Sequence, residues 1–385
     1  MSCRARFVSQ VIIALGLVFA SLTVSAATGW NMTRGVTEIS RAIYDLHMLI
    51  FWICVAIGVV VFGAMLVSIV LHRKSRGVTP ATFHESTRLE VVWTLIPLGI
   101  LIGMAWPATA VLVQMYDSGG EDMTIEVRGY QWRWQYKYLD DDLGEQLSFF
   151  SNLATPREQI RGQAEKGENY LLEVDRPLVI PINRKVRFLL TSNDVIHAWW
   201  VPDFALKRDA IPGFINEMWT IVDEPGIYRG QCAELCGIDH GFMPIEVHAV
   251  TEEEFDAWYA EQRGVARVAQ QELEEGLVRE WDEEDLFARG ETVYGQHCAA
   301  CHQAEGQGVP PVFPGLAGNA VVRGELDAHV NVVFNGRPGT AMQAFGQVLD
   351  PVEMASVMHY QRNAFGNHTG DVVKPADILR FTEAQ

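Results

Sequence analysis

Apolar residues are concentrated at the start of the chain, before residue 115. Residues 46–71 and 92–114 form two apolar segments, each long enough to cross roughly 30 Å of hydrocarbon as a helix. Residues 72–91 join them and contain the basic run HRKSRG, which favours retention of this short loop in the cytoplasm. We therefore predict a transmembrane helical hairpin, with the preceding residues 27–45 and all following domains outside the cytoplasm.

The first 26 residues have the pattern of a secretory signal peptide. Arg4 and Arg6 precede a short apolar stretch, VIIALGLVFA, and small residues follow it up to Ala26. A transmembrane helix is the alternative, but this apolar stretch is short for a membrane span. We expect residues 1–26 to be a signal peptide that is cleaved after Ala26.

Between residues 122 and 250 the pattern changes to short runs with alternating apolar positions. Pro and Gly residues separate these runs, which include KVRFLLTS and MPIEVHAV, and such alternation predicts an antiparallel β-sandwich or barrel. Residues 251–283 are rich in Glu, Gln, Ala and Arg and contain no proline, so we predict a charged helical linker. A smaller helical unit, residues 284–370, and a tail, residues 371–385, complete the chain.

Length and charge narrow the functional classes. A chain of 385 residues is long enough for two or three domains, because single cores rarely grow beyond about 250 to 300 residues. The formal net charge of -18 argues against nucleic-acid binding, which requires Lys and Arg to cluster against phosphates. An acidic surface can instead steer a basic protein partner to a docking site.

The segment CAELCGIDHGFM brings two thiols, an imidazole and a thioether together within twelve residues. Cys232, Cys236, His240 and Met243 supply these groups, and His197 lies upstream in SNDVIHAWWVP. This soft donor set selects copper, whereas a hard cation would require carboxylates. The second cysteine suggests that two thiolates bridge two copper ions. Zinc bound by two Cys and two His, or a disulfide formed in an oxidising compartment, is the alternative.

The CAELCG sequence, followed by His and Met, resembles the CuA-binding loop of cytochrome c oxidase subunit II, and the likeness covers residues 38–250. The resemblance implies a cupredoxin-like Greek-key β-sandwich with a binuclear copper centre. It also implies six copper ligands, of which the last acts through its backbone carbonyl: His197, Cys232, Cys236, His240, Met243 and Glu234. By the same likeness, the Glu234 side chain would reach a magnesium ion shared with subunit I.

Two further residues match functional positions of the same family. Trp132 in GYQWRWQYKY corresponds to the tryptophan that receives the electron from cytochrome c, whereas Trp134 and Tyr136 are expected to pack on one face of a strand. Glu90 in RLEVVWTLIP matches a glutamate near the cytoplasmic mouth of a proton pathway. The alternative explanation of Glu90 is that an acid in the first turn of a helix is favoured by the helix macrodipole.

The CAACH motif, Cys298 to His302, has the spacing for covalent haem c. It predicts two thioether links, from Cys298 and Cys301, and proximal ligation of the iron by His302. A zinc site would need a second pair of cysteines. Met342, in the Pro- and Gly-rich loop RPGTAMQAFG, is the predicted sixth ligand. The other histidines of this unit are expected to be surface or packing residues: His297, His329, His359 and His368.

The helical unit around CAACH resembles a class I cytochrome c. The fold class is therefore multi-domain: a two-helix transmembrane hairpin, a cupredoxin-like Greek-key β-sandwich and an all-α class I cytochrome c domain. Subunits II with such an extension occur in caa-type bacterial oxidases. The resemblance implies a subunit that passes electrons from one covalent haem c through copper to subunit I, which reduces oxygen to water coupled to proton translocation.

The same resemblance implies a place in the cell and a set of partners. The chain would lie in the bacterial plasma membrane, with its copper and haem domains on the periplasmic side. Its partners would be subunit I, subunit III, membrane lipid and an external electron donor, which is a soluble or membrane cytochrome c or a bc complex. The motifs leave no bis-histidine haem site, so we expect the oxygen-reducing site on subunit I. A stand-alone membrane-anchored copper and haem electron carrier is the alternative.

Overall fold

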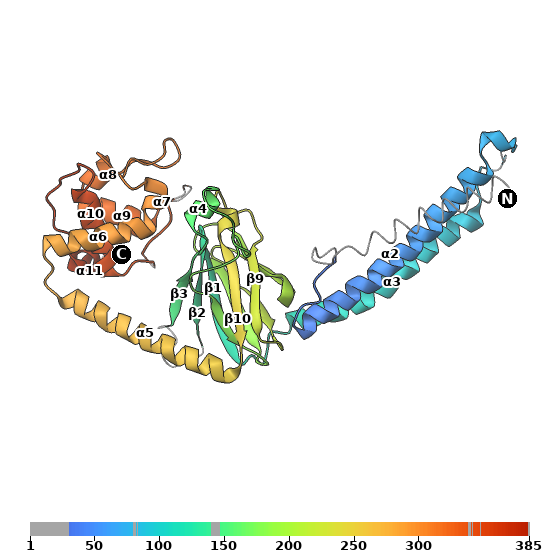
Figure 1. The fold of residues 1–385 in the computed structure, drawn as a ribbon, viewed down its shortest axis with the longest axis horizontal. Coiled ribbons are helices and arrows are strands. Elements are labelled where there is room, and N and C mark those ends of the chain that lie inside the picture. The colour runs from blue at the N-terminus through green and yellow to red at the C-terminus, as the bar shows by residue number, and fades with distance from the viewer. Residues whose placement is uncertain are drawn as a thin grey trace. The chain divides into compact units, whose positions relative to one another are not determined.

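The structure, a computed structural model, describes residues 31–79, 82, 84–139, 147–337, 340, 342–346 and 348–383. The predicted signal peptide, residues 1–26, lies outside the described residues. The chain divides into two compact units, the first formed by residues up to Asp117 with Pro202–Ala205 and the second by the remaining residues. Figure 1 shows the helical first unit in blue and the second unit in green to red.

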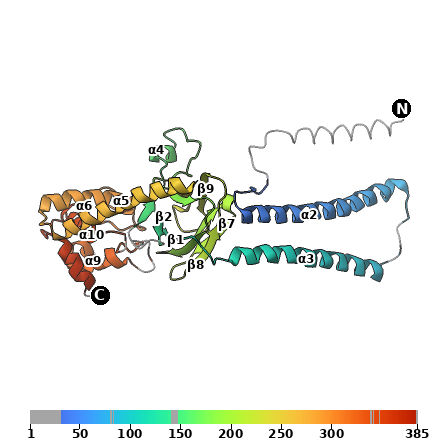
Figure 2. The same ribbon diagram turned by 90° about the horizontal axis from the view of Figure 1, so that it is seen from below.

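The first unit is built on two long apolar helices, α2 (Glu38–Leu71) and α3 (Thr87–Tyr116). Both are long and apolar enough to cross a membrane, and they run side by side (Figure 2). α2 begins eight residues before the apolar segment predicted at residue 46, because Thr37 and Ser40 form a capping box that starts the helix in its polar flank. A short 3-10 helix, η2 (Lys74–Arg76), lies in the connecting loop.

The second unit contains a β-sandwich of two five-stranded sheets, in the orders β3-β2-β1-β5-β8 and β4-β10-β9-β6-β7. The sheets are mixed rather than purely antiparallel, since β1 pairs with β5, and β4 with β10, in parallel. The prediction of an antiparallel sandwich is therefore wrong for these two pairs, because alternation of apolar residues does not report strand direction. The strands are β1 (Met123–Tyr130), β2 (Arg133–Tyr138), β3 (Ser148–Ser151), β4 (Leu178–Pro181), β5 (Val186–Ser192), β6 (His197–Val201), β7 (Leu206–Ala210), β8 (Asn216–Thr220), β9 (Gly226–Cys232) and β10 (Pro244–Val250).

The predicted alternation along the strands fills the space between the two sheets. Every second residue of β5 is buried, and the side chains of Trp134, Tyr136 and Tyr138 on β2 are at most 1% exposed. Burial of such aromatic side chains removes large apolar areas from water, which stabilises the sandwich. The two flanking aromatics of the GYQWRWQYKY segment are therefore core residues, as expected from the sequence.

Helix α5 (Glu252–Val278) follows the last strand directly. Thr251 and Glu254 form a capping box at its start, and Phe255 and Tyr259 stack against each other beside Tyr138 of the sandwich. The charged segment is thus helical, as predicted. The rings of Phe255 and Tyr259 pack one of its faces against Tyr138 of the sheet.

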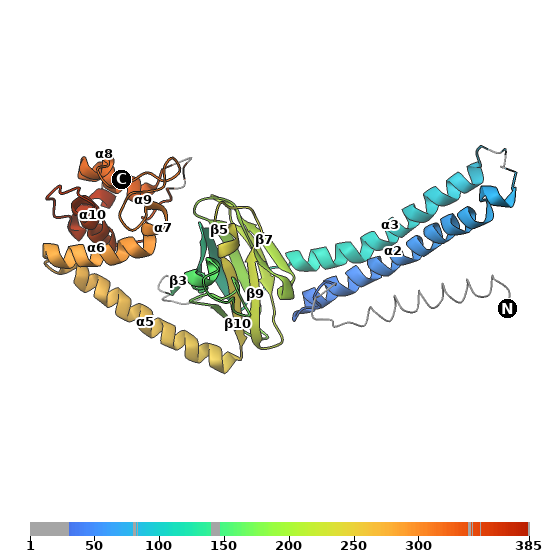
Figure 3. The ribbon, with the colours of Figure 1, turned by 45° about the horizontal axis from the view of Figure 1, so that its top comes forward.

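In the described part of the remaining chain the regular elements are helices joined by loops (Figure 3), and they pack around one core. α6 and α10 cross closely, because Gly290 of α6 leaves no Cβ between its backbone and the carbonyl of Ser356 on α10. The predicted core methionines, Met354 and Met358, are at most 1% exposed. The helices are α6 (Glu283–His297), α7 (Ala299–His302), α8 (Ala320–Arg323), α9 (Leu326–Asn335), α10 (Pro351–Asn363) and α11 (Pro375–Glu383).

Candidate metal centre and haem site

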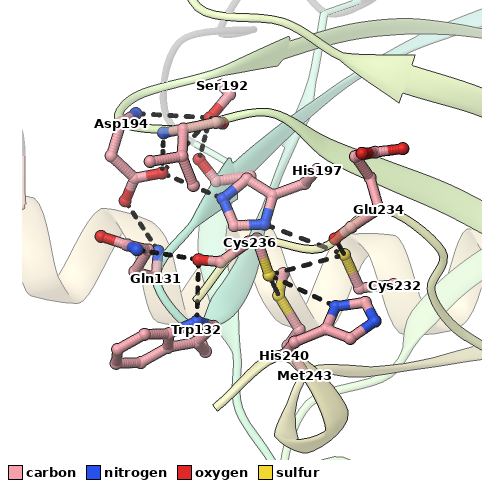
Figure 4. Close-up of polar contacts among 12 residues, drawn as sticks. Gln131, Trp132, Ser192, Asp194, His197, Cys232, Glu234, Cys236, His240 and Met243 are labelled. Atoms are coloured by element: carbon pink, nitrogen blue, oxygen red, sulfur yellow. Dashed lines mark hydrogen bonds and ion pairs between the residues drawn. The ribbon is translucent and has the colours of Figure 1, made fainter. Parts of the chain in front are cut away.

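A cluster of sulfur and nitrogen atoms lies where strand β6 begins and strand β9 ends, and Figure 4 shows its side chains. His197 begins β6 and Cys232 ends β9, and these strands are paired there through Trp199 and Cys232. The donor atoms of His197, Cys232 and Cys236 all lie within 4.8 Å of one another, and the three residues are buried. The two Sγ atoms are 3.9 Å apart and both cysteines are free, so they form no disulfide.

The other residues predicted for the copper site surround this cluster. The 3-10 helix η4 (His240–Phe242) places His240 Nδ1 3.5 Å from Cys236 Sγ, and Met243 Sδ lies 3.6 Å from the same sulfur. The carbonyl oxygen of Glu234 lies 3.4 Å from Cys232 Sγ, while its side chain is exposed. Each thiol thus has one imidazole beside it, 3.9 Å away in the case of Cys232 and His197 Nδ1.

This donor set fits a pair of copper ions. Two central thiols, two flanking imidazoles and a thioether are soft ligands, and the thioether is foreign to a closed zinc site. The two thiols are coupled: hydrogen bonding from Cys236 is the main cause that lowers the pKa of Cys232. The same hydrogen bond is the main cause that raises the pKa of Cys236, and burial adds to it. A bound cation would favour both thiolates.

Trp132 lies in the turn between β1 and β2, half-buried, and its indole Nε1 donates a hydrogen bond to the carbonyl of Cys236, 3.2 Å away. The predicted electron-entry residue therefore touches the backbone of the metal cluster. Gln131, in the same turn, donates from Nε2 to the same carbonyl at 2.8 Å. Glu90 is exposed in the first turn of α3 and belongs to the first compact unit, whereas the metal cluster belongs to the second. The predicted role of Glu90 in proton entry stays a prediction.

Three residues of the CAACH motif, Cys298, Cys301 and His302, line a cavity of about 280 Å³ in the helical part. His302 Nδ1 donates to the carbonyl of Pro314 at 2.8 Å, which leaves its Nε2 free to bind a metal. Met342, from the loop between α9 and α10, lies on the same cavity wall and packs against the core. The lining is largely apolar, as the cavity for a porphyrin should be.

Burial also acts on the thiols of this motif. It raises the pKa of Cys298 to about 12, and it raises the pKa of Cys301. Burial therefore favours an uncharged state of both sulfurs. Thioether links to a porphyrin carry no charge and fit this environment.

Several residues at the two sites carried no recognisable signal in the sequence. Asp194 hydrogen-bonds the imidazole of His197, and only its place three residues earlier in SNDVIH could have indicated this. His329 and Gln361 line the haem cavity and hydrogen-bond each other at 3.0 Å. His297 lines it too. The expectation that these histidines are surface or packing residues is therefore incomplete, since two of them face the cavity.

Comparison with protein families indicates which family the membrane hairpin and the β-sandwich belong to. Residues 25–111 match the family model for the transmembrane domain of cytochrome c oxidase subunit II, and residues 123–250 match that for its periplasmic domain. The probable cytochrome c oxidase subunit 2 of Rickettsia bellii is 38% identical over 264 residues, which cover 68% of this chain and 95% of that protein. The chain belongs to the cytochrome c oxidase subunit II family. It is thus a membrane-anchored protein with a periplasmic domain, and the predicted fold class is confirmed.

Other relatives of this subunit II extend the comparison. The cytochrome c oxidase subunit 2 of Cereibacter sphaeroides is 33% identical over 245 residues, covering 61% of this chain and 81% of that protein. The crystal structure of the periplasmic domain of subunit II of Bradyrhizobium japonicum cytochrome oxidase is 39% identical, with a TM-score of 0.33, and covers 40% of this chain and 98% of that one. Residues 285–360 match a further model, cytochrome c oxidase, cbb3-type, subunit III, in keeping with a fused haem c domain.

Proposed function

We propose that this subunit II receives electrons from an external donor at its haem c domain and delivers them through its copper site to subunit I, where oxygen is reduced to water with proton translocation. When bound, the haem iron and the copper pair each supply one-electron redox chemistry. The observation that carries the proposal is the presence of two separate sulfur-rich sites on one chain, each with the donor set that its group requires.

The proposed copper ligands are the six residues at the end of the sandwich. Their arrangement supports this role, because burial of Cys232 and Cys236 keeps water and oxidants away from both sulfurs. The nearby carbonyl of Glu234 is a further donor. The exposed Glu234 side chain is available for a magnesium ion at an interface with subunit I. The full set is His197, Cys232, Glu234, Cys236, His240 and Met243.

In the proposed haem attachment, Cys298 and Cys301 would form the thioether links, and His302 and Met342 would bind the iron. The hydrogen bond from His302 Nδ1 to Pro314 fixes the ring in the tautomer that presents Nε2 to the iron. The Met342 sulfur would raise the haem potential.

Electron entry at Trp132 and proton entry at Glu90 complete the proposed assignment. Trp132 is supported by its hydrogen bond to the Cys236 carbonyl, which joins an accessible aromatic ring to the metal cluster. Glu90 is supported by its exposed place in the first turn of a membrane-spanning helix. Ionisable residues at such places often mark ion routes.

We propose the lipid and protein partners of the chain from its exposed apolar surfaces. The most apolar stretch of each of the helices α2 and α3 has no residue buried within the described chain. Lipid and a partner such as subunit I or subunit III must therefore cover these stretches. Leu235 and Ile238, at 85% and 76% exposed beside the copper ligands, add an apolar surface suited to a protein partner. We assign the assembly to the bacterial plasma membrane, with a cytochrome c or a bc complex as donor.

Replacement of Cys232 by Ser in the full-length chain tests the copper assignment. We expect loss of both copper ions and of the near-infrared copper absorption, with oxidase turnover falling to background, because one bridging thiolate is missing. Haem content should stay unchanged. Cys54→Ser removes an exposed free thiol on α2 and serves as the matched control.

The proposal fails if the Cys232→Ser protein retains two copper ions per chain, or if the unaltered protein contains zinc. Purification from the native membrane tests the partner. Recovery without a large multi-span subunit would favour a stand-alone electron carrier.

A further inference from the structure

Asp194 lies in the bend before β6 and contacts two separate parts of the metal site (Figure 4). Its side chain is 9% exposed and that of His197 is fully buried. Building on the proposed copper function, we propose that Asp194 is a positioning residue whose two carboxylate oxygens hold the ligand His197 and the Gln131–Trp132 turn in one fixed arrangement around the copper pair.

The first oxygen sets the tautomer and direction of the histidine ring. Asp194 Oδ1 lies 2.9 Å from His197 Nε2. A carboxylate accepts a hydrogen bond, so the ring proton resides on Nε2 and the lone pair on Nδ1. Nδ1 is the atom that faces the Cys232 sulfur, 3.9 Å away. The carboxylate therefore selects the tautomer that can bind a metal.

The second oxygen fixes the neighbouring turn. Asp194 Oδ2 accepts a hydrogen bond from the backbone N–H of Gln131 at 2.7 Å. The Gln131 side chain and the Trp132 indole both donate to the carbonyl of Cys236, at 2.8 and 3.2 Å. One carboxylate thus connects the imidazole on one side of the cluster with the backbone of the second cysteine on the other.

Asp194 and His197 are themselves held in place. The backbone N–H of Val195 donates to Asp194 Oδ1 at 2.7 Å, and the N–H of Asp194 donates to Ser192 Oγ at 3.3 Å. A Cβ atom on Gly129 would lie 2.7 Å from the His197 ring, so the glycine lets the ring approach β1 closely. These contacts hold both side chains in place before a metal binds.

The charge of Asp194 has a consequence that a merely structural role would not have. A carboxylate on the distal nitrogen makes an imidazole a stronger electron donor, and its negative charge favours the oxidised, more positive copper pair. Asp194 therefore lowers the reduction potential of the copper site. A neutral side chain of the same shape should raise that potential while the site still binds copper.

The test uses the full-length protein in its purified oxidase. In Asp194→Asn, we expect the copper count and near-infrared band to remain, the midpoint potential of that band to shift upward, and the His197 Nε2 proton to exchange faster in NMR spectra. Asp194→Ala removes both contacts, and copper affinity should fall about 10- to 100-fold. Asp122→Asn is the matched control, since Asp122 Oδ2 likewise accepts a backbone N–H, from Lys185 at 2.7 Å, just before the opposite end of β1.

The outcomes separate this proposal from the one on which it rests. If Asp194→Asn keeps the potential of the unaltered protein and of Asp122→Asn, Asp194 only shapes its own turn and the proposal is wrong. An upward shift in both variants would point to loss of charge anywhere in the sandwich and would overturn it as well. If the unaltered protein lacks a copper pair, the proposed function itself fails.

Discussion

Met342, the proposed sixth haem ligand, lies in a loop rather than on a helix. Its loop is fastened by hydrogen bonds from the Arg337 N–H to the Met342 carbonyl, at 2.8 Å, and from the Met342 N–H to Thr340 Oγ1, at 3.2 Å. Met342→Leu keeps the apolar volume but removes the sulfur, so the haem potential should fall, as measured by redox titration of the haem absorption. Met354→Leu, in the core of α10, should leave the potential unchanged. Equal potentials in both variants would place the sixth ligand elsewhere.

His329 makes the stability of the haem domain depend on pH. The ring is 2% exposed, and burial followed by the charge of Arg362 lowers its pKa to about 4. The unfolded chain would take up a proton near pH 6.5, whereas the folded chain resists this until about pH 4. The free energy of unfolding should therefore fall by about 3 kcal/mol as the pH drops through this window, with no effect above pH 6.5.

Denaturant unfolding of the full chain, followed by haem absorption between pH 7 and pH 4, measures this dependence. His329→Gln should flatten it, because the neutral amide has nothing to titrate. His368→Gln, at an exposed position, should keep the slope of the unaltered protein. A slope that is identical in both variants would contradict the assignment to His329.

At the residue scale, the sequence indicated the proposed metal-binding residues but not the residues that hydrogen-bond to them. Cys232, Cys236, His240 and Met243 were recognisable because one loop carries them at fixed spacing. Asp194 and Gln131 are 63 residues apart, and the bond between them arises only when β1 and β5 are paired. Such contacts leave no local pattern in a single sequence.

The packing of α6 on α10 is decided by one glycine. A Cβ at position 290 would collide with the carbonyl of Ser356, and α10 cannot move away without opening the core. Gly290→Ala should therefore destabilise the haem domain by about 1 to 3 kcal/mol, as expected for overpacking. Denaturant unfolding and haem incorporation measure the effect.

Gly295 provides the control on the same helix. Nothing lies within 4 Å of a Cβ built there, so Gly295→Ala should stabilise the domain by about 0.5 to 1 kcal/mol through helix propensity alone. A loss of stability of similar size in both variants would show that backbone freedom, rather than the crossing, requires these glycines.

The elements themselves were largely predictable, with errors at their ends and in their pairing. Apolar segments located both membrane helices, but α2 begins at Glu38 because its cap is polar and hydropathy does not detect caps. The alternation of β5 was visible in KVRFLLTS, yet its parallel pairing with β1 depends on a connection of many residues. Local patterns record burial, whereas pairing is decided by the whole sheet.

For the whole molecule, motif order and hydropathy predicted the division into a hairpin, a β domain and a helical unit, and the family resemblance implied the fold of each domain. The apolar hairpin, the alternating segment and the CAACH unit each have a distinct pattern, and the three matched family models follow the same order along the chain. The wall of the haem cavity was less predictable. Cys298 identifies one side of it, but His329 and Gln361 come from helices whose packing determines that they meet there.

Helix α5 is fastened at both ends, by Phe255 and Tyr259 near Tyr138 and by Gly276 against Val352 of α10. Its 27 residues correspond to about 40 Å of continuous helix. The number of residues therefore determines the rotation between the two ends of α5 as well as the distance between them. Each residue inserted into α5 would rotate its two ends relative to each other by about 100° around the helix axis, and seven residues, close to two full turns, would restore their alignment. Homologous linkers that preserve this geometry should therefore differ in length by whole helical turns.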